Sequence, residues 1–177
     1  MIKYVSGTCD FGLFYIKESN VSLAWYFEAD WASNANDRKS TAGGFFYVGT
    51  NLVAWISKKQ NSISLSTAEA KYIAARSCCS QLLSMKKLLG DYGLSQETMV
   101  VYCDNTSTID IPKNLVQHSK TKHIDIRYHF IKDLVKIKVV ALEYILTERQ
   151  NAYIFTKPLD RSKFESLCQV NGVITCP

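Results

Sequence analysis

Hydrophobic and polar residues alternate through the first third of the chain, a pattern typical of β-strands. Two such runs span residues 13–16 and 21–27. Two more, at residues 44–49 and 52–57, flank Thr50-Asn51. Because Asn between two apolar runs favours a tight turn, the last two runs predict a hairpin. We therefore expect three consecutive antiparallel strands over 21–57.

The hydrophobic period changes to that of a helix after Ser66. Apolar residues then recur at helical spacing for more than twenty positions. Ser66 followed by Glu69 forms a capping box, in which the Ser66 side chain accepts from the backbone three residues on and Glu69 reaches back. We expect the helix to end near Gly90 or Gly93, since glycine is common just beyond a helix.

The rest of the chain alternates between strands and helices. Residues 99–103 form a continuously apolar run, typical of a buried central strand. Four further elements are expected: a short helix interrupted at Pro112, a helix over 124–136, a strand over 139–146, and a last helix from Ala152 with a disturbance at Pro158. This order predicts an α/β protein with one mixed five-stranded sheet and helices on its faces, and its best match is the ribonuclease H-like fold.

Composition narrows the class of protein further. The 177 residues suit one domain, and 47% hydrophobic with 21% charged residues excludes a disordered or low-complexity chain. No apolar run approaches the roughly 18 residues that cross a bilayer. The net charge of +5 is compatible with a polyanionic partner. Six cysteines without a C-x-x-C pair, and a broken apolar run at the N-terminus, indicate an intracellular protein that is not secreted.

Acidic residues at strand ends are the candidates for chemistry in such a fold. Carboxylates from strand ends and from the first helix would converge at one edge of the sheet. Mg²⁺ prefers oxygen ligands and keeps several waters, so a few carboxylates suffice to hold it. Two such ions roughly 4 Å apart can activate water and stabilise the leaving oxygen of a phosphodiester.

Several long motifs carry a specific resemblance. They are KYVSGTCDFGLFY (3–15), ADWASNANDRKSTAGG (29–44), SKKQNSISLSTAEAKYIAA (57–75), CDNTSTI (103–109), HSKTKHIDIRYHFIKD (118–133) and FTKPL (155–159). In this order they resemble the ribonuclease H domain at the C-terminal end of the copia-type retrotransposon polyprotein, over about residues 3–167. The resemblance implies cleavage of the RNA strand of an RNA–DNA hybrid by four acids and Mg²⁺.

The resemblance also implies where the four acids should lie. The first position is Glu28 instead of Asp, the third is an intact Asp104, and the fourth is Tyr153 instead of Asp. The family motif for the second acid contains two glutamates. We take the second of them as catalytic, which places Lys71 there; if the first is the ligand, the position is Glu69.

These replacements should impair the site. Glu28 moves a carboxylate by roughly 1 Å, which can cost on the order of 10²-fold where geometry is tight. Lys71 places a cation beside a site meant for two divalent ions, so we doubt that Mg²⁺ binds. Asp30 lies on the same strand face as Glu28 and could partly compensate, whereas Glu69 is rotated by roughly 200° from Lys71. Without the resemblance, we would interpret Asp104 as the N-terminal cap of the helix that follows the buried strand.

A basic stretch offers candidates for nucleic-acid contacts. The resemblance favours phosphate contacts by Lys120, Lys122, His123 and Arg127, although such a cluster is also typical of a solvated surface. The expected partner is an RNA–DNA hybrid or another nucleic acid. The three histidines lack the Cys or acid spacing of a zinc site.

Three functions follow from these observations. The first is a two-metal hybrid ribonuclease with impaired catalysis, and the second is a non-catalytic nucleic-acid-binding relic of a retrotransposon polyprotein, which we favour. The third is an unstable fragment, because Met1 falls inside a family motif and the upstream reverse transcriptase is missing. We expect residues 1–20 to be a remnant of the preceding segment and 21–177 to form the domain, located in the cytoplasm or a virus-like particle.

Overall fold

A computed structural model describes residues 6–17, 21–112 and 122–175, with side chains given outside 122–128. Its main sheet has five strands in the order β4-β3-β2-β5-β6. Three of them, β2 (Leu23–Asp30), β3 (Thr41–Val48) and β4 (Asn51–Lys59), form an antiparallel meander. β5 (Met99–Cys103) then pairs parallel with β2, and β6 (Val140–Tyr144) pairs parallel with β5. The predicted mixed five-stranded α/β sheet is therefore confirmed.

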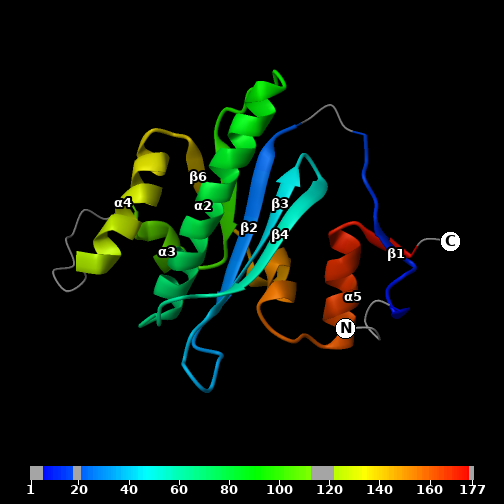
Figure 1. Cartoon of the computed structure of the whole chain (residues 1–177), viewed down its shortest axis with the longest axis horizontal. Coiled ribbons are helices and arrows are strands. Elements are labelled where there is room, and N and C mark those ends of the chain that lie inside the picture. The colour runs from blue at the N-terminus through cyan, green and yellow to red at the C-terminus, as the bar shows by residue number, and fades with distance from the viewer. Residues whose placement is uncertain (1–5, 18–20, 113–121, 176–177) are drawn as a thin grey trace.

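Helices cover both faces of this sheet. The long α2 (Thr67–Asp91) lies over one face, with α3 (Thr106–Asp110) and α4 (Lys122–Lys136) beside it (Figure 1). Between these helices and the sheet lies the larger core, which includes Trp25, Phe46 and Leu82. A smaller cluster occupies the opposite face. Two short 3-10 helices, η1 (Thr147–Arg149) and η2 (Asn151–Phe155), follow β6 and begin to cover that face.

The C-terminal region differs from the sequence prediction. A single helix from Ala152 is wrong: η1 and η2 precede Pro158, and α5 (Arg161–Val170) begins only after the Asp160 cap. Proline removes a backbone donor and disfavours helix at the residue before it, which splits the segment. The chain then ends in a strand that we did not predict, β7 (Val173–Thr175).

The first predicted strand also differs. The structure places β1 at Phe11–Leu13, not at 13–16, and pairs it antiparallel with β7 in a separate two-stranded sheet. This pair lies beside α5, on the side of the molecule opposite α4 (Figure 1). The expected division into a remnant of the preceding segment over 1–20 and a domain over 21–177 stays a prediction.

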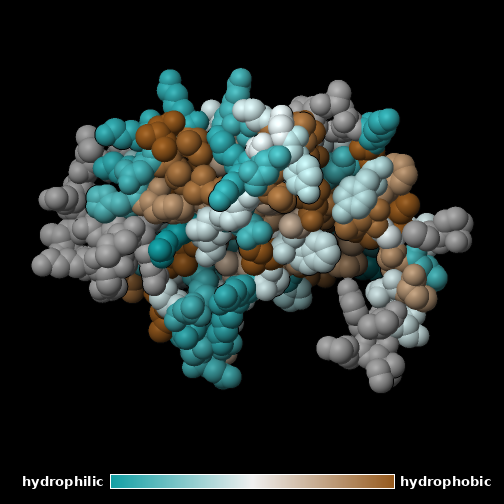
Figure 2. Space-filling view, turned by 45° about the horizontal axis from the view of Figure 1, so that its top comes forward, coloured by the Kyte–Doolittle hydropathy of each residue, from teal (hydrophilic) through white to brown (hydrophobic). Residues whose placement is uncertain are grey.

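A polar loop, residues 31–40, joins β2 to β3 and projects from one end of the sheet (Figure 1). Figure 2 shows mainly hydrophilic residues at this projection. Asn34 organises its turn, because its side-chain oxygen accepts from the amides of Asn36 and Asp37. Asp37 in turn pairs with Lys59 at 2.7 Å, which ties the loop to the end of β4. Among the helices the structure describes, none is long and apolar enough to cross a membrane.

Candidate active site

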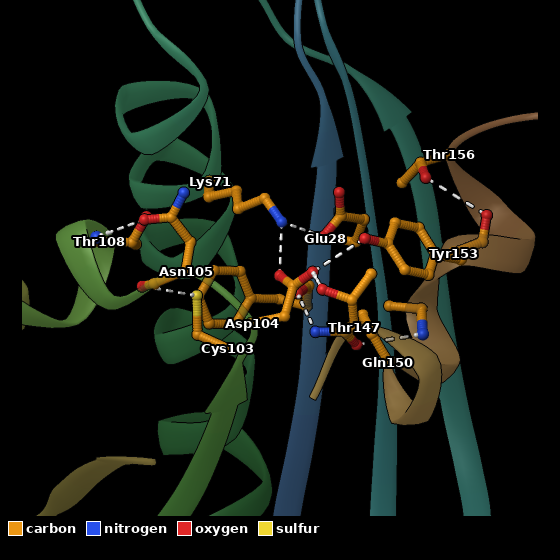
Figure 3. A network of polar contacts seen from close by, with 12 residues as sticks. Glu28, Lys71, Cys103, Asp104, Asn105, Thr108, Thr147, Gln150, Tyr153 and Thr156 are labelled. Atoms are coloured by element: carbon orange, nitrogen blue, oxygen red, sulfur yellow. Dashed lines mark hydrogen bonds and ion pairs between the residues drawn. The ribbon is translucent and has the colours of Figure 1, made fainter. Parts of the chain in front are cut away.

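Three charged side chains lie together at one end of the sheet: Glu28 from β2, Lys71 from the second turn of α2, and Asp104 at the end of β5. The Lys71 ammonium lies 2.6 Å from Glu28 Oε2 and 2.5 Å from Asp104 Oδ1 (Figure 3). All three side chains are buried, with exposed fractions of 7% for Lys71, 4% for Glu28 and 3% for Asp104. The ammonium therefore donates to both acids within the fold, and we call these residues, together with Tyr153, the Lys71 cluster.

Local sequence explains why each charged residue lies there. Ser66 caps α2 by accepting from the Glu69 amide at 3.1 Å, so the helix begins at Thr67 and places Lys71 one turn inside. Glu28 lies near the end of β2, opposite Gly43 in β3. Asp104 directly follows β5 and precedes Asn105, whose side chain caps α3 by accepting from the Thr108 amide at 3.0 Å. The helix cap that Asp104 could have supplied is thus made by Asn105.

Tyr153 completes the cluster from the opposite side. Its hydroxyl donates to Asp104 Oδ2 at 2.8 Å, and the Thr147 hydroxyl reaches the same oxygen at 3.3 Å (Figure 3). Lys157 Nζ lies 3.7 Å from the centroid of the Tyr153 ring, a cation–π contact. Both oxygens of Asp104 therefore face donors from the protein.

Two residues outside the predicted set position η2 and hence Tyr153. Gln150 is fully buried and donates from Nε2 to the Phe27 carbonyl at 3.1 Å, which fixes the start of η2 against β2. Gly43 lets η2 approach closely, because a Cβ there would lie 2.7 Å from Thr156 Cγ2 and 2.9 Å from Phe155 Cβ. The sequence carries no signal for Gln150, since a lone amide in a loop has no distinctive pattern.

Two further candidates lie outside the cluster. The Glu69 carboxylate accepts from the Leu65 amide at 2.6 Å, one residue beyond the Ser66 amide expected for a capping box. The Asp30 carboxylate accepts from the Thr41 amide across the β2–β3 pair. Each acid therefore satisfies a backbone donor and is not brought to Glu28 and Asp104. Of the two glutamate positions in the helix motif, Lys71 is the one that faces these acids.

The basic candidates fall where the structure gives little detail. Lys120 lies outside the described residues. Lys122, His123 and Arg127 lie in the first half of α4, and their side chains are outside what the structure describes. Their role as phosphate contacts stays a prediction.

The charge balance of the cluster sets the pKa of each member. Burial alone would raise the pKa of Asp104, but the hydrogen bond and charge of Lys71, with the Tyr153 hydroxyl, hold it below its usual value. Burial raises the pKa of Glu28 to about 7, and Lys71 offsets only part of that effect. Burial also disfavours the charged form of Lys71, yet Glu28 and Asp104 outweigh it and raise the Lys71 pKa. Lys71 thus lowers the pKa of Asp104 below its usual value, whereas at Glu28 burial outweighs Lys71 and the pKa stays raised.

This arrangement does not fit a divalent metal ion. Mg²⁺ would need the oxygens of Glu28 and Asp104 that Lys71 already binds, and a unit charge at about 4 Å opposes a cation by roughly 4 kcal/mol at an effective dielectric of 20. Over residues 6–17, 21–112 and 122–175, no group of three or more His, Cys, Asp or Glu side chains could hold a metal ion. The chemistry the cluster offers is that of a closed ion pair. Lys71 is held protonated, and the Tyr153 pKa is raised by burial and by the nearby acids.

Comparison with solved structures defines the class of fold. The structure of LC11-RNase H1 in complex with RNA/DNA hybrid aligns with a TM-score of 0.56 at 13% identity, covering 76% of this chain and 94% of that one. The N-terminal RNase H domain of a Mycobacterium tuberculosis protein aligns with the same TM-score at 12% identity, over 85% of this chain and 98% of that one. The chain therefore has the ribonuclease H fold.

Sequence relatives then give the family. The chain is 38% identical over 169 residues to the retrovirus-related Pol polyprotein from transposon TNT 1-94 of Nicotiana tabacum, covering 96% of this chain. It is 36% identical over 178 residues to the Pol polyprotein from transposon RE2 of Arabidopsis thaliana. The chain belongs to this family of copia-type retrotransposon Pol polyproteins, as its motifs predicted, and spans 12 to 13% of the length of these two relatives. No family model matches the chain.

Proposed function

We propose that this chain is a ribonuclease H-fold domain that binds nucleic acid and does not hydrolyse it. The observation that carries the proposal is the Lys71 ammonium bound between Glu28 and Asp104. A hydrolase of this family needs divalent ions at those oxygens, and here the protein supplies its own cation. No step of phosphodiester cleavage then remains for the cluster to perform.

The other groups of the cluster do not offer metal-free hydrolysis. A general base should have a pKa near the working pH and reach its proton directly or through one water. Glu28 meets the first condition, with a pKa of about 7. It fails the second, because its side chain is 4% exposed and one of its oxygens accepts from Lys71. Glu28 therefore stabilises the fold and does not activate water.

Loss of the metal site would remove cleavage but need not remove binding of an RNA–DNA hybrid. The net charge of +5 favours a polyanion, and a structural neighbour with the same fold, LC11-RNase H1, was solved with an RNA/DNA hybrid. We place the phosphate contacts on Lys120, Lys122, His123 and Arg127. Binding by such contacts should weaken as salt rises, because counterions are released from the phosphates.

The alternative is a working hybrid ribonuclease, favoured by the retention of Asp104 at the end of β5 with a lowered pKa. A labelled RNA–DNA hybrid incubated with the protein and either Mg²⁺ or Mn²⁺ separates the two functions. We expect binding that persists in EDTA and no release of RNA fragments above a protein-free blank. Metal-dependent cleavage that is lost in Asp104→Asn would establish the nuclease and overturn the proposal. A hybrid that does not bind at low salt would overturn it as well.

A further inference from the structure

A cavity of about 300 Å³ lies between α2 and the strands β3 and β4, and its lining includes Gly43, the register partner of Glu28. Its partly exposed apolar lining includes Ala42 from β3, Ile56 from β4 and Ile73 from α2. The volume is at the lower end of the range for small-molecule sites, which are mostly apolar with a few polar groups.

The rim of this cavity is cationic. Lys58, Lys59 and Arg76 line it, together with the polar side chains of Asn61 and Ser77. Lys59 is neutralised by its ion pair with Asp37 at 2.7 Å. Among the residues that the structure describes, Lys58 and Arg76 have no acidic partner, and no Asp or Glu side chain lines the cavity.

The lip of the cavity is held in place by buried hydrogen bonds. The Gln60 side chain donates from Nε2 to the Ala70 carbonyl at 2.8 Å, and the Gln60 backbone N–H donates to the Ser40 carbonyl at 2.8 Å. These bonds join the end of β4 both to α2 and to the start of β3. The backbone at the end of β4 is therefore fixed against α2, so the lining needs little backbone rearrangement when a ligand binds.

We propose that this cavity binds a nucleoside phosphate, with the base on the apolar lining and the phosphate between Lys58 and Arg76. An arginine and a lysine without acidic partners suit a phosphate, since the guanidinium can bind two of its oxygens and the ammonium a third. The partly exposed apolar side chains of Ala42, Ile56 and Ile73 offer the base a surface to pack on. Both a free mononucleotide and the phosphorylated end of a strand carry this chemistry. None of the four residues of the Lys71 cluster lines the cavity, and the test of the cavity does not depend on hybrid binding.

Calorimetric titration of the whole chain tests the site with three probes at one ionic strength: adenosine 5′-monophosphate, adenosine, and inorganic phosphate. We expect the monophosphate to bind at least about tenfold more tightly than either fragment, because base and phosphate each contribute a contact. Equal binding of inorganic phosphate, equal binding of adenosine, or no binding of the monophosphate would overturn the proposal.

Charge reversal at the rim gives the matched comparison. Lys58→Glu and Arg76→Glu should each weaken monophosphate binding by about tenfold or more, whereas Lys87→Glu on the exposed part of α2 should leave it unchanged. Lys58 is exposed, so its reversal should leave the thermal unfolding curve in place. If Lys87→Glu weakens binding as much as Lys58→Glu, the site is non-specific attraction and the proposal fails.

A 5′-phosphorylated trinucleotide distinguishes the two sources of the ligand. Tighter binding than the monophosphate, with the same sensitivity to Lys58→Glu, assigns the cavity to strand ends. Equal or weaker binding with that sensitivity assigns it to free nucleotides. If Lys58→Glu changes neither trinucleotide binding nor monophosphate binding, both assignments are contradicted.

Discussion

The Lys71 ammonium lies 2.5 Å from Asp104, the residue that the sequence motifs predict to be the one unchanged acid of the family's site. Lys71, which the motifs predict to replace an acid, is thus hydrogen-bonded to the acid that they predict to be retained. If position 71 is an acid in the family, its loss alone would leave the site open to solvent. In this chain the Lys71 side chain fills the site, because its ammonium contacts both Glu28 and Asp104.

Removing the ammonium should destabilise the fold strongly. Lys71→Met keeps most of the side-chain volume and leaves Glu28 and Asp104 buried without their cation. Breaking one partner from a buried ion pair costs about 3–5 kcal/mol, so we expect a loss of that size in the free energy of unfolding by urea. Lys87→Met is the control on the same helix and should change stability by no more than about 0.5 kcal/mol. Equal effects of the two substitutions would show that Lys71 is not held by the acids.

Stability should fall as pH rises from about 4.5 to about 7. The Glu28 pKa is raised from 4.5 to about 7, so across this window the folded state holds a proton that the unfolded state has released. Folding is therefore favoured at the acidic side, by up to about 3 kcal/mol on an order-of-magnitude basis. Asp104 has the opposite effect on stability and acts at lower pH. Its pKa is depressed, so its contribution to stability is lost only in more acidic solution.

The variant Glu28→Gln assigns that pH dependence. An amide has no proton to release in this range, so unfolding free energies measured at pH 5 and pH 7.5 should differ by much less than in the unchanged protein. The matched control is Glu165→Gln, at an exposed position on α5, which should keep the full difference. If the pH dependence of the unfolding free energy persists in Glu28→Gln, a group other than Glu28 is responsible for it.

Glu69 should behave as a capping residue. Its carboxylate accepts from the Leu65 amide, so Glu69→Ala removes one bond at the start of α2 and should cost about 1 kcal/mol in unfolding free energy. It should also leave the pH dependence that Glu28 controls unchanged, because Glu69 does not contact the cluster. A flattened pH profile in Glu69→Ala would place Glu69 among the site residues after all.

Gly43 should be intolerant of even the smallest side chain. A Cβ there would lie 2.7–3.1 Å from three atoms of residues 152–156, so Gly43→Ala must displace η2 or β3. We expect a loss of about 1–3 kcal/mol, measured by urea unfolding, and loss of the Tyr153 contact with Asp104. Gly90→Ala is the contrasting variant, since nothing lies within 4 Å of its added Cβ, and it should be neutral or slightly stabilising.

Much of the fold was predictable from hydrophobic period and local chemistry. The hairpin, the buried strand β5 and the Ser66 cap of α2 each depend on neighbouring residues, which is what a sequence pattern reports. The region after β6 was not predictable in the same way. There the chain adopts two short 3-10 helices because Gln150 binds the backbone of β2 and Gly43 leaves room for them. Such long-range contacts leave no periodic trace.

The site was predictable in part for the same reason. The motifs placed Glu28, Lys71, Asp104 and Tyr153, and the structure brings these four together. The direct bonds from Lys71 to both acids could not be read from the sequence, because they depend on how far a flexible side chain reaches. Thr147 and Gln150 were missed, since a hydroxyl and an amide in a loop carry no distinctive signal.

Titration of Mg²⁺ into the protein tests most directly whether Lys71 has taken the place of the metal. We compare the unchanged chain with a variant that carries Glu28→Asp, Lys71→Glu and Tyr153→Asp together, with folding checked by circular dichroism. We expect no calorimetric binding of Mg²⁺ to the unchanged chain at millimolar concentration. The triple variant should bind Mg²⁺, and adding Asp104→Asn to it should remove that binding. Mg²⁺ binding by the unchanged chain that is likewise lost in Asp104→Asn would contradict this expectation.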